Sequence, residues 1–203
     1  MKITSAVFHS SAPNLATCPE TALPEFAFIG RSNVGKSSLI NMLTREEGLA
    51  KVSRVPGKTR LINFFTINNT WSLVDLPGYG YAKVGKKQRS SFSASVAEYL
   101  QRRPNLLGTF VLIDCRLSPQ KLDLEFLHWM VGCGLPFVIA FTKADKLTEK
   151  AAQKTIEAFL AGMREISEET PDYVLTSSKS DTGRAEILGL VASVLDEKPD
   201  LPA

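Results

Sequence analysis

The stretch that decides the fold is Gly30-Arg31-Ser32-Asn33-Val34-Gly35-Lys36-Ser37-Ser38, a Gly-x-x-x-x-Gly-Lys-Ser phosphate loop. The apolar run 26–29 precedes it, and a helix-like pattern over 38–43 follows. Glycines let consecutive backbone N–H groups turn inward around an anion, and a helix that starts at the loop adds its positive dipole end. This context predicts a nucleotide phosphate site, with Lys36 reaching the outer phosphates and the Ser37 hydroxyl on a magnesium ion.

Apolar runs alternate with helical patterns along the rest of the chain, which predicts an α/β fold with a doubly wound, mostly parallel sheet and helices on both faces. The turn signal at Asn68-Asn69 predicts an antiparallel hairpin, so we expect six strands with one antiparallel edge strand. Ser118 is expected to cap the third helix, with Pro119 as its first residue. The expected strands are 25–29, 60–67, 71–75, 108–114, 137–141 and 173–176; the expected helices are 36–44, 87–102, 119–131, 148–167 and 184–195.

The chain has 203 residues, of which 44% are apolar, and this is enough for one well-packed domain. Pro13, Pro19 and several Ser/Thr residues predict an N-terminal arm over 1–23, before a nucleotide-binding domain over 24–195 and a flexible tail over 196–203. Three cysteines without metal spacing, no signal-peptide core and no apolar stretch near ~20 residues indicate a cytoplasmic protein without a membrane span.

Positive charge is concentrated in one segment. Residues 51–103 carry ten Lys/Arg against two acids, a net charge of +8, whereas the whole chain has +3. This asymmetry is typical of a nucleic-acid or acidic partner. A solvated helix face together with residues that serve the nucleotide phosphates is the alternative, and charge alone does not decide between them.

Two further motifs belong to the phosphate end of the site. Asp75-Leu76-Pro77-Gly78 follows the strand 71–75, where Asp75 can hold a magnesium-bound water and the Gly78 N–H can approach the terminal phosphate. Taken alone this tetrapeptide favours an ordinary turn, but its position just past a strand and 39 residues after Lys36 favours the phosphate role. In the loop between the first helix and the second strand, Thr59 is the expected magnesium ligand after Gly57 and Lys58, with Ser53 as the lesser candidate; γ-phosphate would order this loop.

The motif Thr142-Lys143-Ala144-Asp145, which follows the strand 137–141, predicts which base the bound nucleotide carries. Asp145 can accept two hydrogen bonds from neighbouring N–H groups of guanine, a pair that adenine lacks, and the stem of Lys143 can lie along the base. Backbone N–H groups and hydroxyls of Thr176-Ser177-Ser178 suit the guanine carbonyl. These motifs occur in the expected order, each directly after a strand, and so predict GTP/GDP with Mg²⁺ as the ligands.

Three residues are the catalytic candidates, namely Lys36, Thr59 and Gly78. Three residues are the candidate magnesium ligands, namely Ser37, Thr59 and Asp75. The full set expected to bind the nucleotide is Gly30, Arg31, Ser32, Asn33, Val34, Gly35, Lys36, Ser37, Ser38, Gly57, Lys58, Thr59, Asp75, Leu76, Pro77, Gly78, Thr142, Lys143, Ala144, Asp145, Thr176, Ser177 and Ser178.

The phosphate loop, Pro56-Gly57-Lys58-Thr59 leading into Ile62-Asn63-Phe64-Phe65, Asp75-Leu76-Pro77-Gly78-Tyr79-Gly80-Tyr81-Ala82 and Thr142-Lys143-Ala144-Asp145 carry a resemblance to one family. Over residues 24–190 the chain resembles the EngB (YihA/YsxC-type) GTPases of bacteria. Many GTPases have Asn where this chain has Thr142, and the threonine fits the family. The resemblance implies a Ras-like fold, GTP and magnesium binding, a role in assembling the large ribosomal subunit, and a link to cell division and septation.

Turnover is expected to be slow. Many switch GTPases have a glutamine after Asp-x-x-Gly to orient the attacking water, whereas Tyr79 stands here, so we expect roughly 10⁻⁴ to 10⁻² s⁻¹ without a partner. Asn33 stands where some related GTPases coordinate potassium; activation by K⁺ is a hypothesis, and an asparagine that only caps the loop is the alternative. Arg31 and Arg60 are near the site in sequence, with structural or partner-facing roles favoured over catalytic ones.

Tyr81, Lys83, Lys86, Lys87 and Arg89 interleave aromatic and basic side chains, a pattern suited to stacked bases and phosphates of ribosomal RNA. The expected partner is the precursor of the large ribosomal subunit, its rRNA and its ribosomal proteins, bound by a monomer. An ATP-dependent P-loop kinase and a non-hydrolysing nucleotide-binding module remain as alternatives to the GTP switch.

Overall fold

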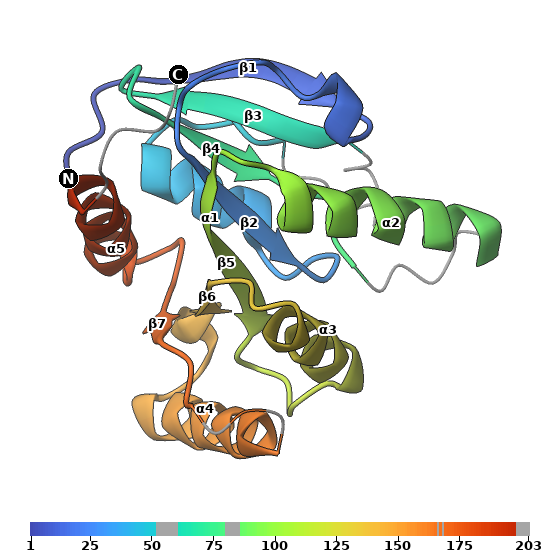
Figure 1. The fold of residues 1–203 in the computed structure, drawn as a ribbon. Helices are drawn as coiled ribbons and strands as arrows, with labels where there is room; N and C mark the ends of the chain where they lie inside the picture. Colours follow the sequence, from blue (N-terminus) through green and yellow to red (C-terminus); the bar gives the residue numbers. More distant parts are fainter. Residues whose placement is uncertain (52–60, 80–85, 166, 168, 198–203) are drawn as a thin grey trace.

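The computed structural model describes residues 1–51, 61–79, 86–165, 167 and 169–197, with the side chains of 86–93 outside the description. A seven-stranded sheet lies between helices on both faces (Figure 1), in the order β1-β3-β4-β2-β5-β6-β7. The strands are β1 Ala6–Ala12, β2 Glu25–Gly30, β3 Ile62–Ile67, β4 Trp71–Asp75, β5 Leu106–Asp114, β6 Phe137–Thr142 and β7 Tyr173–Leu175. The helices are α1 Lys36–Thr44, α2 Lys86–Arg102, α3 Lys121–Gly132, α4 Glu149–Arg164 and α5 Arg184–Asp196, with short 3-10 turns at Leu15–Thr17 and Ala144–Lys146.

The predicted α/β, mostly parallel architecture is confirmed, but the strand count and the edge were wrong. β1 pairs antiparallel with β3 and forms a seventh, outermost strand, so the antiparallel strand β3 lies one position inside the edge. The expected N-terminal arm therefore contributes a strand to the sheet. Most of β1 is partly or fully exposed, and Val7 and Phe8 face solvent, so it lacks the apolar alternation by which a half-buried strand is predicted.

The predicted hairpin is confirmed between β3 and β4. Asn68 and Asn69 both have positive φ, of 51° and 56°, which a tight two-strand turn with the right twist needs and which asparagine tolerates. Asn68 also fixes the N-terminus, because its side-chain oxygen accepts hydrogen bonds from the backbone N–H groups of Thr4 (2.7 Å) and Ser5 (3.1 Å).

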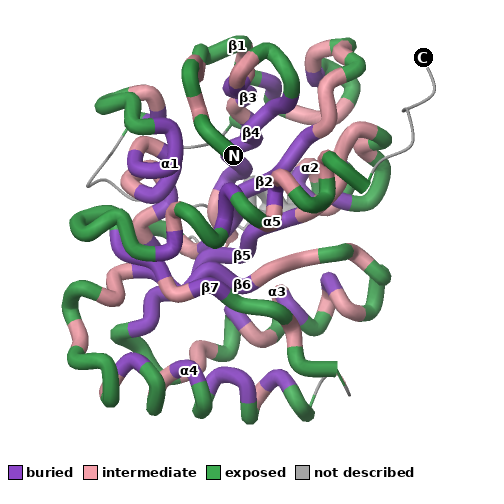
Figure 2. Tube along the Cα trace, turned by 90° about the vertical axis from the view of Figure 1, so that its left-hand side faces the viewer, coloured by how far each residue is buried: buried purple, intermediate pink, exposed green. Residues whose placement is uncertain are grey.

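Two hydrophobic cores hold the helices on the sheet. Buried side chains of α1 and α5, such as Leu39 and Val191, pack on one face. Buried side chains of α2, α3 and α4, such as Tyr99, Met130 and Phe159, pack on the other. Figure 2 shows the consequence, since β2 and β4 are buried along their length while α4 alternates between buried and exposed positions. The central strands are thereby rigid supports for the loops at their carboxyl ends.

The helices begin within one residue of the positions expected from the sequence, with one exception. Thr148, where the sequence placed the helix start, caps α4, since its hydroxyl accepts a hydrogen bond from the Ala151 N–H at 3.3 Å. The third helix was predicted to begin at Pro119 with Ser118 as its cap, and this was wrong: α3 begins at Lys121 after Gln120, whose side chain makes no capping bond. Within the described part of the chain, no helix combines the length and apolar character needed to cross a membrane.

Candidate functional site

The phosphate loop lies between β2 and α1, as the sequence predicts. Gly30 ends β2 where a methyl group would lie 2.7 Å from the Leu112 carbonyl oxygen, so only glycine lets β2 and β5 come this close. Asn33 and Gly35 have positive φ, of 63° and 107°, which turn the backbone around the loop. Gly35 caps α1 without a side-chain bond, leaving the first N–H groups of the helix for an anion.

Lys36 and Asp75 meet at the base of this loop. Lys36 begins α1 and Asp75 ends β4, which lies beside β2 with Asp75 opposite Phe28. Their side chains form an ion pair and are nearly fully buried. Burial lowers the pKa of Lys36 to about 7, while the Asp75 carboxylate acts in the opposite direction. Asp75 thus holds the ammonium group of Lys36 at the loop, and nucleotide phosphates can compete with Asp75 for this ammonium group.

The segment after Asp75 runs directly against the phosphate loop. The Leu76 N–H donates to the Phe28 carbonyl at 3.0 Å, and Leu76 and Pro77 are buried. A methyl group on Gly78 would lie 2.7 Å from the Gly30 carbonyl oxygen. Glycine is therefore required for this close approach, which brings the Asp-x-x-Gly motif and the phosphate loop together as predicted.

The base motif is tied to the phosphate loop from the neighbouring strand β6. The buried Thr142 hydroxyl donates to the Val34 carbonyl at 2.7 Å. Lys143 has a left-handed backbone with φ 64°, and its ammonium donates to the Asn33 carbonyl at 2.6 Å. Two consecutive residues of the base motif thus hold two consecutive carbonyls of the phosphate loop.

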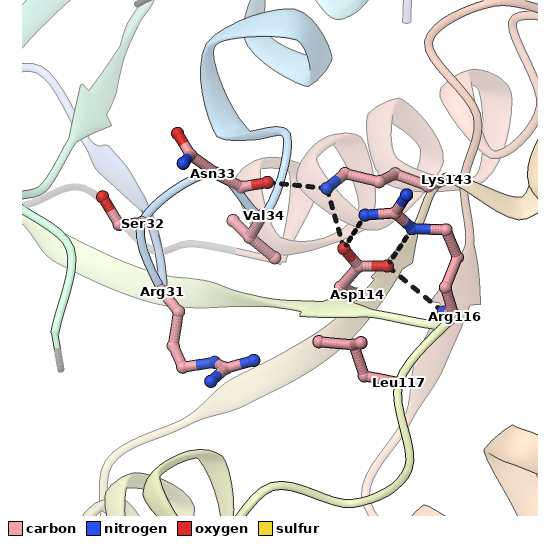
Figure 3. A pocket seen from close by; sticks show the side chains of 8 residues that line it. All are labelled: Arg31, Ser32, Asn33, Val34, Asp114, Arg116, Leu117 and Lys143. Atoms are coloured by element: carbon pink, nitrogen blue, oxygen red, sulfur yellow. Dashed lines mark hydrogen bonds and ion pairs between the residues drawn. The ribbon is translucent and has the colours of Figure 1, made fainter. Parts of the chain in front are cut away.

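A pocket opens beside this junction (Figure 3), lined by Arg31, Ser32, Asn33, Val34, Asp114, Arg116, Leu117 and Lys143. Asp114, the last residue of β5, accepts a hydrogen bond from Lys143 at 2.7 Å and from Arg116 at 2.9 and 2.8 Å. Burial raises the pKa of Asp114, but these hydrogen bonds outweigh burial and hold the pKa below its ordinary value. Asp114 and Arg116 were not among the predicted site residues; the signal that could have indicated Asp114 is an acid at the carboxyl end of a central strand.

The carboxylate of Asp145 is oriented by the loop after β7. The Ser177 hydroxyl donates to Asp145 at 2.9 Å, and this bond is the main reason that the pKa of Asp145 lies below its ordinary value. The Ala144 N–H donates to the Thr176 carbonyl at 3.1 Å, while Ser178 is exposed. The structure therefore brings Asp145, Thr176 and Ser177 together as predicted, and Lys146 forms an ion pair with Asp145 at 3.5 Å.

Other predicted residues lie elsewhere or outside the description. Arg31 turns away from the Lys143–Asp114 pair (Figure 3) and forms an ion pair with Asp123 on α3, at 3.2 Å. Arg31 therefore has a structural partner in Asp123, which agrees with the structural role favoured from the sequence. Outside the described residues lie Ser53, Gly57, Lys58, Thr59, Arg60, Tyr81, Lys83 and the side chains of Lys86, Lys87 and Arg89.

Comparison with known proteins agrees with this geometry. Residues 25–143 match the family model described as "50S ribosome-binding GTPase". The chain is 51% identical to the probable GTP-binding protein EngB of Porphyromonas gingivalis, over 97% of this chain and 98% of that one. It is 52% identical to the protein of the same description from Phocaeicola vulgatus, over 96% of this chain and 97% of that one.

Solved structures share the fold. A crystal structure of a probable GTP-binding protein EngB has a TM-score of 0.68 and 22% identity, and covers 86% of this chain and 100% of its own. Era in complex with MgGDPNP and nucleotides 1506–1542 of 16S ribosomal RNA has a TM-score of 0.67 and 20% identity, covering 91% of this chain and 60% of its own. The phosphate loop, the base motif and the near full-length identity with the curated relatives lead to one conclusion: the chain belongs to the EngB family of GTP-binding GTPases.

Proposed function

We propose that this protein is a GTP-dependent switch in the assembly of the large ribosomal subunit, binding the rRNA and ribosomal proteins of its precursor. The observation that carries the proposal is the match of residues 25–143 to the 50S ribosome-binding GTPase family. The matched part contains the phosphate loop, the Asp75–Gly78 segment and the start of the base motif. In the sequence, the basic segment 51–103 includes Thr59 and the Asp75–Gly78 motif, so we expect the bound nucleotide to control its conformation.

In this proposal the phosphates are held by the loop of residues 30–38, with Lys36 exchanging Asp75 for the outer phosphates. Ser37, Asp75 and Thr59 would hold Mg²⁺, which prefers such oxygen ligands. The residues fit the ion, because Asp75 presents a buried carboxylate at the loop. When bound, Mg²⁺ offsets the negative charge on the phosphate oxygens.

Hydrolysis by the protein alone is proposed to be slow. Gly78 can bring its backbone N–H near the terminal phosphate, but the Tyr79 hydroxyl donates to Asp123 on α3 at 3.0 Å, so this side chain is not available to orient water. Single-turnover hydrolysis by purified protein should proceed at about 10⁻⁴ to 10⁻² s⁻¹. Much faster turnover would contradict this part of the proposal, and no phosphate release at all would favour a non-hydrolysing module.

Co-sedimentation with ribosomal particles tests the ribosomal role. With a non-hydrolysable GTP analogue the protein should sediment with large-subunit precursors, and it should do so less with GDP and at higher salt. Replacing Lys86 and Lys87 by alanine should weaken binding. The matched control, Lys150→Ala with Lys154→Ala, removes the same charge from exposed positions of α4 and should not. Binding that ignores both nucleotide and salt would overturn the proposal.

Three finer points belong to the same proposal. Potassium is proposed to activate hydrolysis through Asn33; equal rates in K⁺ and Na⁺, before and after Asn33→Ala, would end that idea. A role in cell division and septation predicts elongated, undivided cells on depletion.

The protein is proposed to act as a cytoplasmic monomer, which size-exclusion chromatography and cell fractionation test. An ATP-dependent kinase is disfavoured by membership of a GTPase family.

A further inference from the structure

Asp123 connects two loops of the nucleotide site to one helix. It lies in the first turn of α3 and is only 2% exposed. The same carboxylate oxygen accepts the Tyr79 hydroxyl at 3.0 Å and faces the Arg31 Nε at 3.2 Å. Arg31 belongs to the phosphate loop, and Tyr79 directly follows Gly78. One buried carboxylate therefore contacts both loops that approach the terminal phosphate.

Packing reinforces the hydrogen bond from Tyr79. Its ring stacks on Phe126, one turn further along α3, with centroids 4.3 Å apart and planes 16° from parallel. Phe126 in turn contacts Trp129, with centroids 5.8 Å apart. Burial, and then the Asp123 carboxylate, raise the pKa of Tyr79 well above its ordinary value, so the hydroxyl keeps its proton and donates at neutral pH.

The position of Tyr79 constrains Gly78. Because Gly78 lies so close to the Gly30 carbonyl that a methyl group would not fit, a small displacement of the segment changes how its N–H faces the phosphate loop. Displacements of about 1 Å at a reacting centre can reduce rates as much as 10²-fold. A buried carboxylate is costly unless it is paired, and Asp123 has both a cation and a hydroxyl as partners.

We propose that Asp123 is a positioning residue for GTP hydrolysis, which holds Tyr79 on α3 and thereby fixes Gly78 against the phosphate loop. The inference rests on the GTPase activity of the family and is independent of the ribosomal partner. Asp123 touches neither nucleotide nor water in this role, and acts through Tyr79 and Arg31.

The test is single-turnover GTP hydrolysis by the full-length protein, with GTP affinity measured separately. Asp123→Ala should lower the rate about tenfold and leave the Kd for GTP within about twofold. Asp123→Asn, which keeps a hydrogen-bond acceptor, should recover most of the rate. Tyr79→Phe keeps the ring on Phe126 but loses the hydroxyl, and combining it with Asp123→Ala should lower the rate no further than Asp123→Ala alone.

A spectroscopic readout separates positioning from general stability. In a Trp71→Phe background Trp129 is the remaining tryptophan, since the chain has two. Its emission should change in Asp123→Ala and stay near that of the background in Asp123→Asn. Glu125→Ala, an exposed residue of the same helix whose partner is Lys121 at 3.7 Å, is the matched control and should change neither rate nor emission.

A folded Asp123→Ala protein with an unchanged hydrolysis rate would overturn the inference. Rate losses that multiply in the double variant would also overturn it, because Tyr79 and Asp123 would then act independently. If Asp123→Ala does not fold, Tyr79→Phe decides, because it removes the same hydrogen bond: a lowered rate supports the inference, and a rate equal to that of the wild type overturns it. Failure of the wild type to bind ribosomal particles would count against the proposed function alone.

Discussion

The Thr142 hydroxyl donates a hydrogen bond to the Val34 carbonyl at 2.7 Å, joining residues 108 positions apart in the chain. Thr142 ends the strand that carries the base motif, and Val34 lies in the phosphate loop. Many GTPases have an asparagine at this position. The buried threonine hydroxyl of this chain links the strand of the base motif to the phosphate loop.

Loss of this bond should weaken nucleotide binding. Thr142→Val keeps the shape of the side chain but removes the donor, and an unsatisfied buried carbonyl costs roughly 1–3 kcal/mol. We expect the Kd for GDP to rise about tenfold or more. Thr142→Ser is the control because it keeps the hydroxyl, and its Kd should stay near that of the wild type. Fluorescence titration with a labelled GDP measures both; equal affinities of the valine and serine variants would show that the bond does not matter.

The orientation of Asp145 should depend on Ser177. Ser177→Ala removes the 2.9 Å hydrogen bond, so the pKa of Asp145 should rise toward its ordinary value of 3.8. In the wild type the folded-state pKa is lowered, so the bond contributes stability above pH 3.8 and this contribution is lost as the pH falls through the folded-state pKa. Carboxyl carbon NMR across pH 2–6 measures the shift.

At neutral pH the same variant should bind GDP several-fold more weakly, because the carboxylate is no longer held in place. Ser178→Ala, the exposed neighbour, is the control and should alter neither the pKa of Asp145 nor the affinity. An unshifted pKa in Ser177→Ala would contradict the assigned cause.

Gly78 should not tolerate even a methyl group. In Gly78→Ala the new Cβ would lie 2.7 Å from the Gly30 carbonyl oxygen, so the segment must move away from the phosphate loop. We expect hydrolysis to fall at least tenfold while GDP binding changes little. Gly189→Ala is the matched control: it lies within α5 with nothing within 4 Å of the added carbon, and should be more stable by about 1 kcal/mol with normal hydrolysis. Single-turnover assays and thermal denaturation measure both.

Much of the fold was predictable because strong local signals agreed with the final packing. Buried central strands read as continuous apolar runs, and the bounds of α1, Lys36–Thr44, and of β4, Trp71–Asp75, match their predictions. β1 was missed because its pairing with β3 depends on backbone hydrogen bonds at an edge where Val7 and Phe8 remain exposed. The start of α3 was placed early because Ser118-Pro119 resembles a helix cap that the structure does not use.

The candidate site, like the fold, has residues that the sequence predicted and residues that it did not. Residues in motifs, such as Lys36 and Asp145, were predicted because the few neighbouring residues of each motif are enough to indicate its chemistry. Asp114 and Asp123 were not, because Lys143 and Tyr79, which contact them, come from distant segments that only the fold brings together. Asp123 meets Tyr79 across 44 positions, and the pattern of α3 alone gives an acid in a first helical turn, which is common for electrostatic reasons.

Competition between purine nucleotides measures the central claim, that Asp145 selects guanine. ATP should displace labelled GDP only at concentrations about 10⁴-fold above those of GTP. Asp145→Asn should lose GDP affinity and gain affinity for xanthosine diphosphate, whose extra carbonyl accepts from the new amide. Asp181→Asn, an exposed acid whose partner is Arg45 at 3.8 Å, is the matched control and should keep the preference of the wild type. Equal displacement by ATP and GTP, or an Asp145→Asn protein that still prefers GDP, would contradict the account.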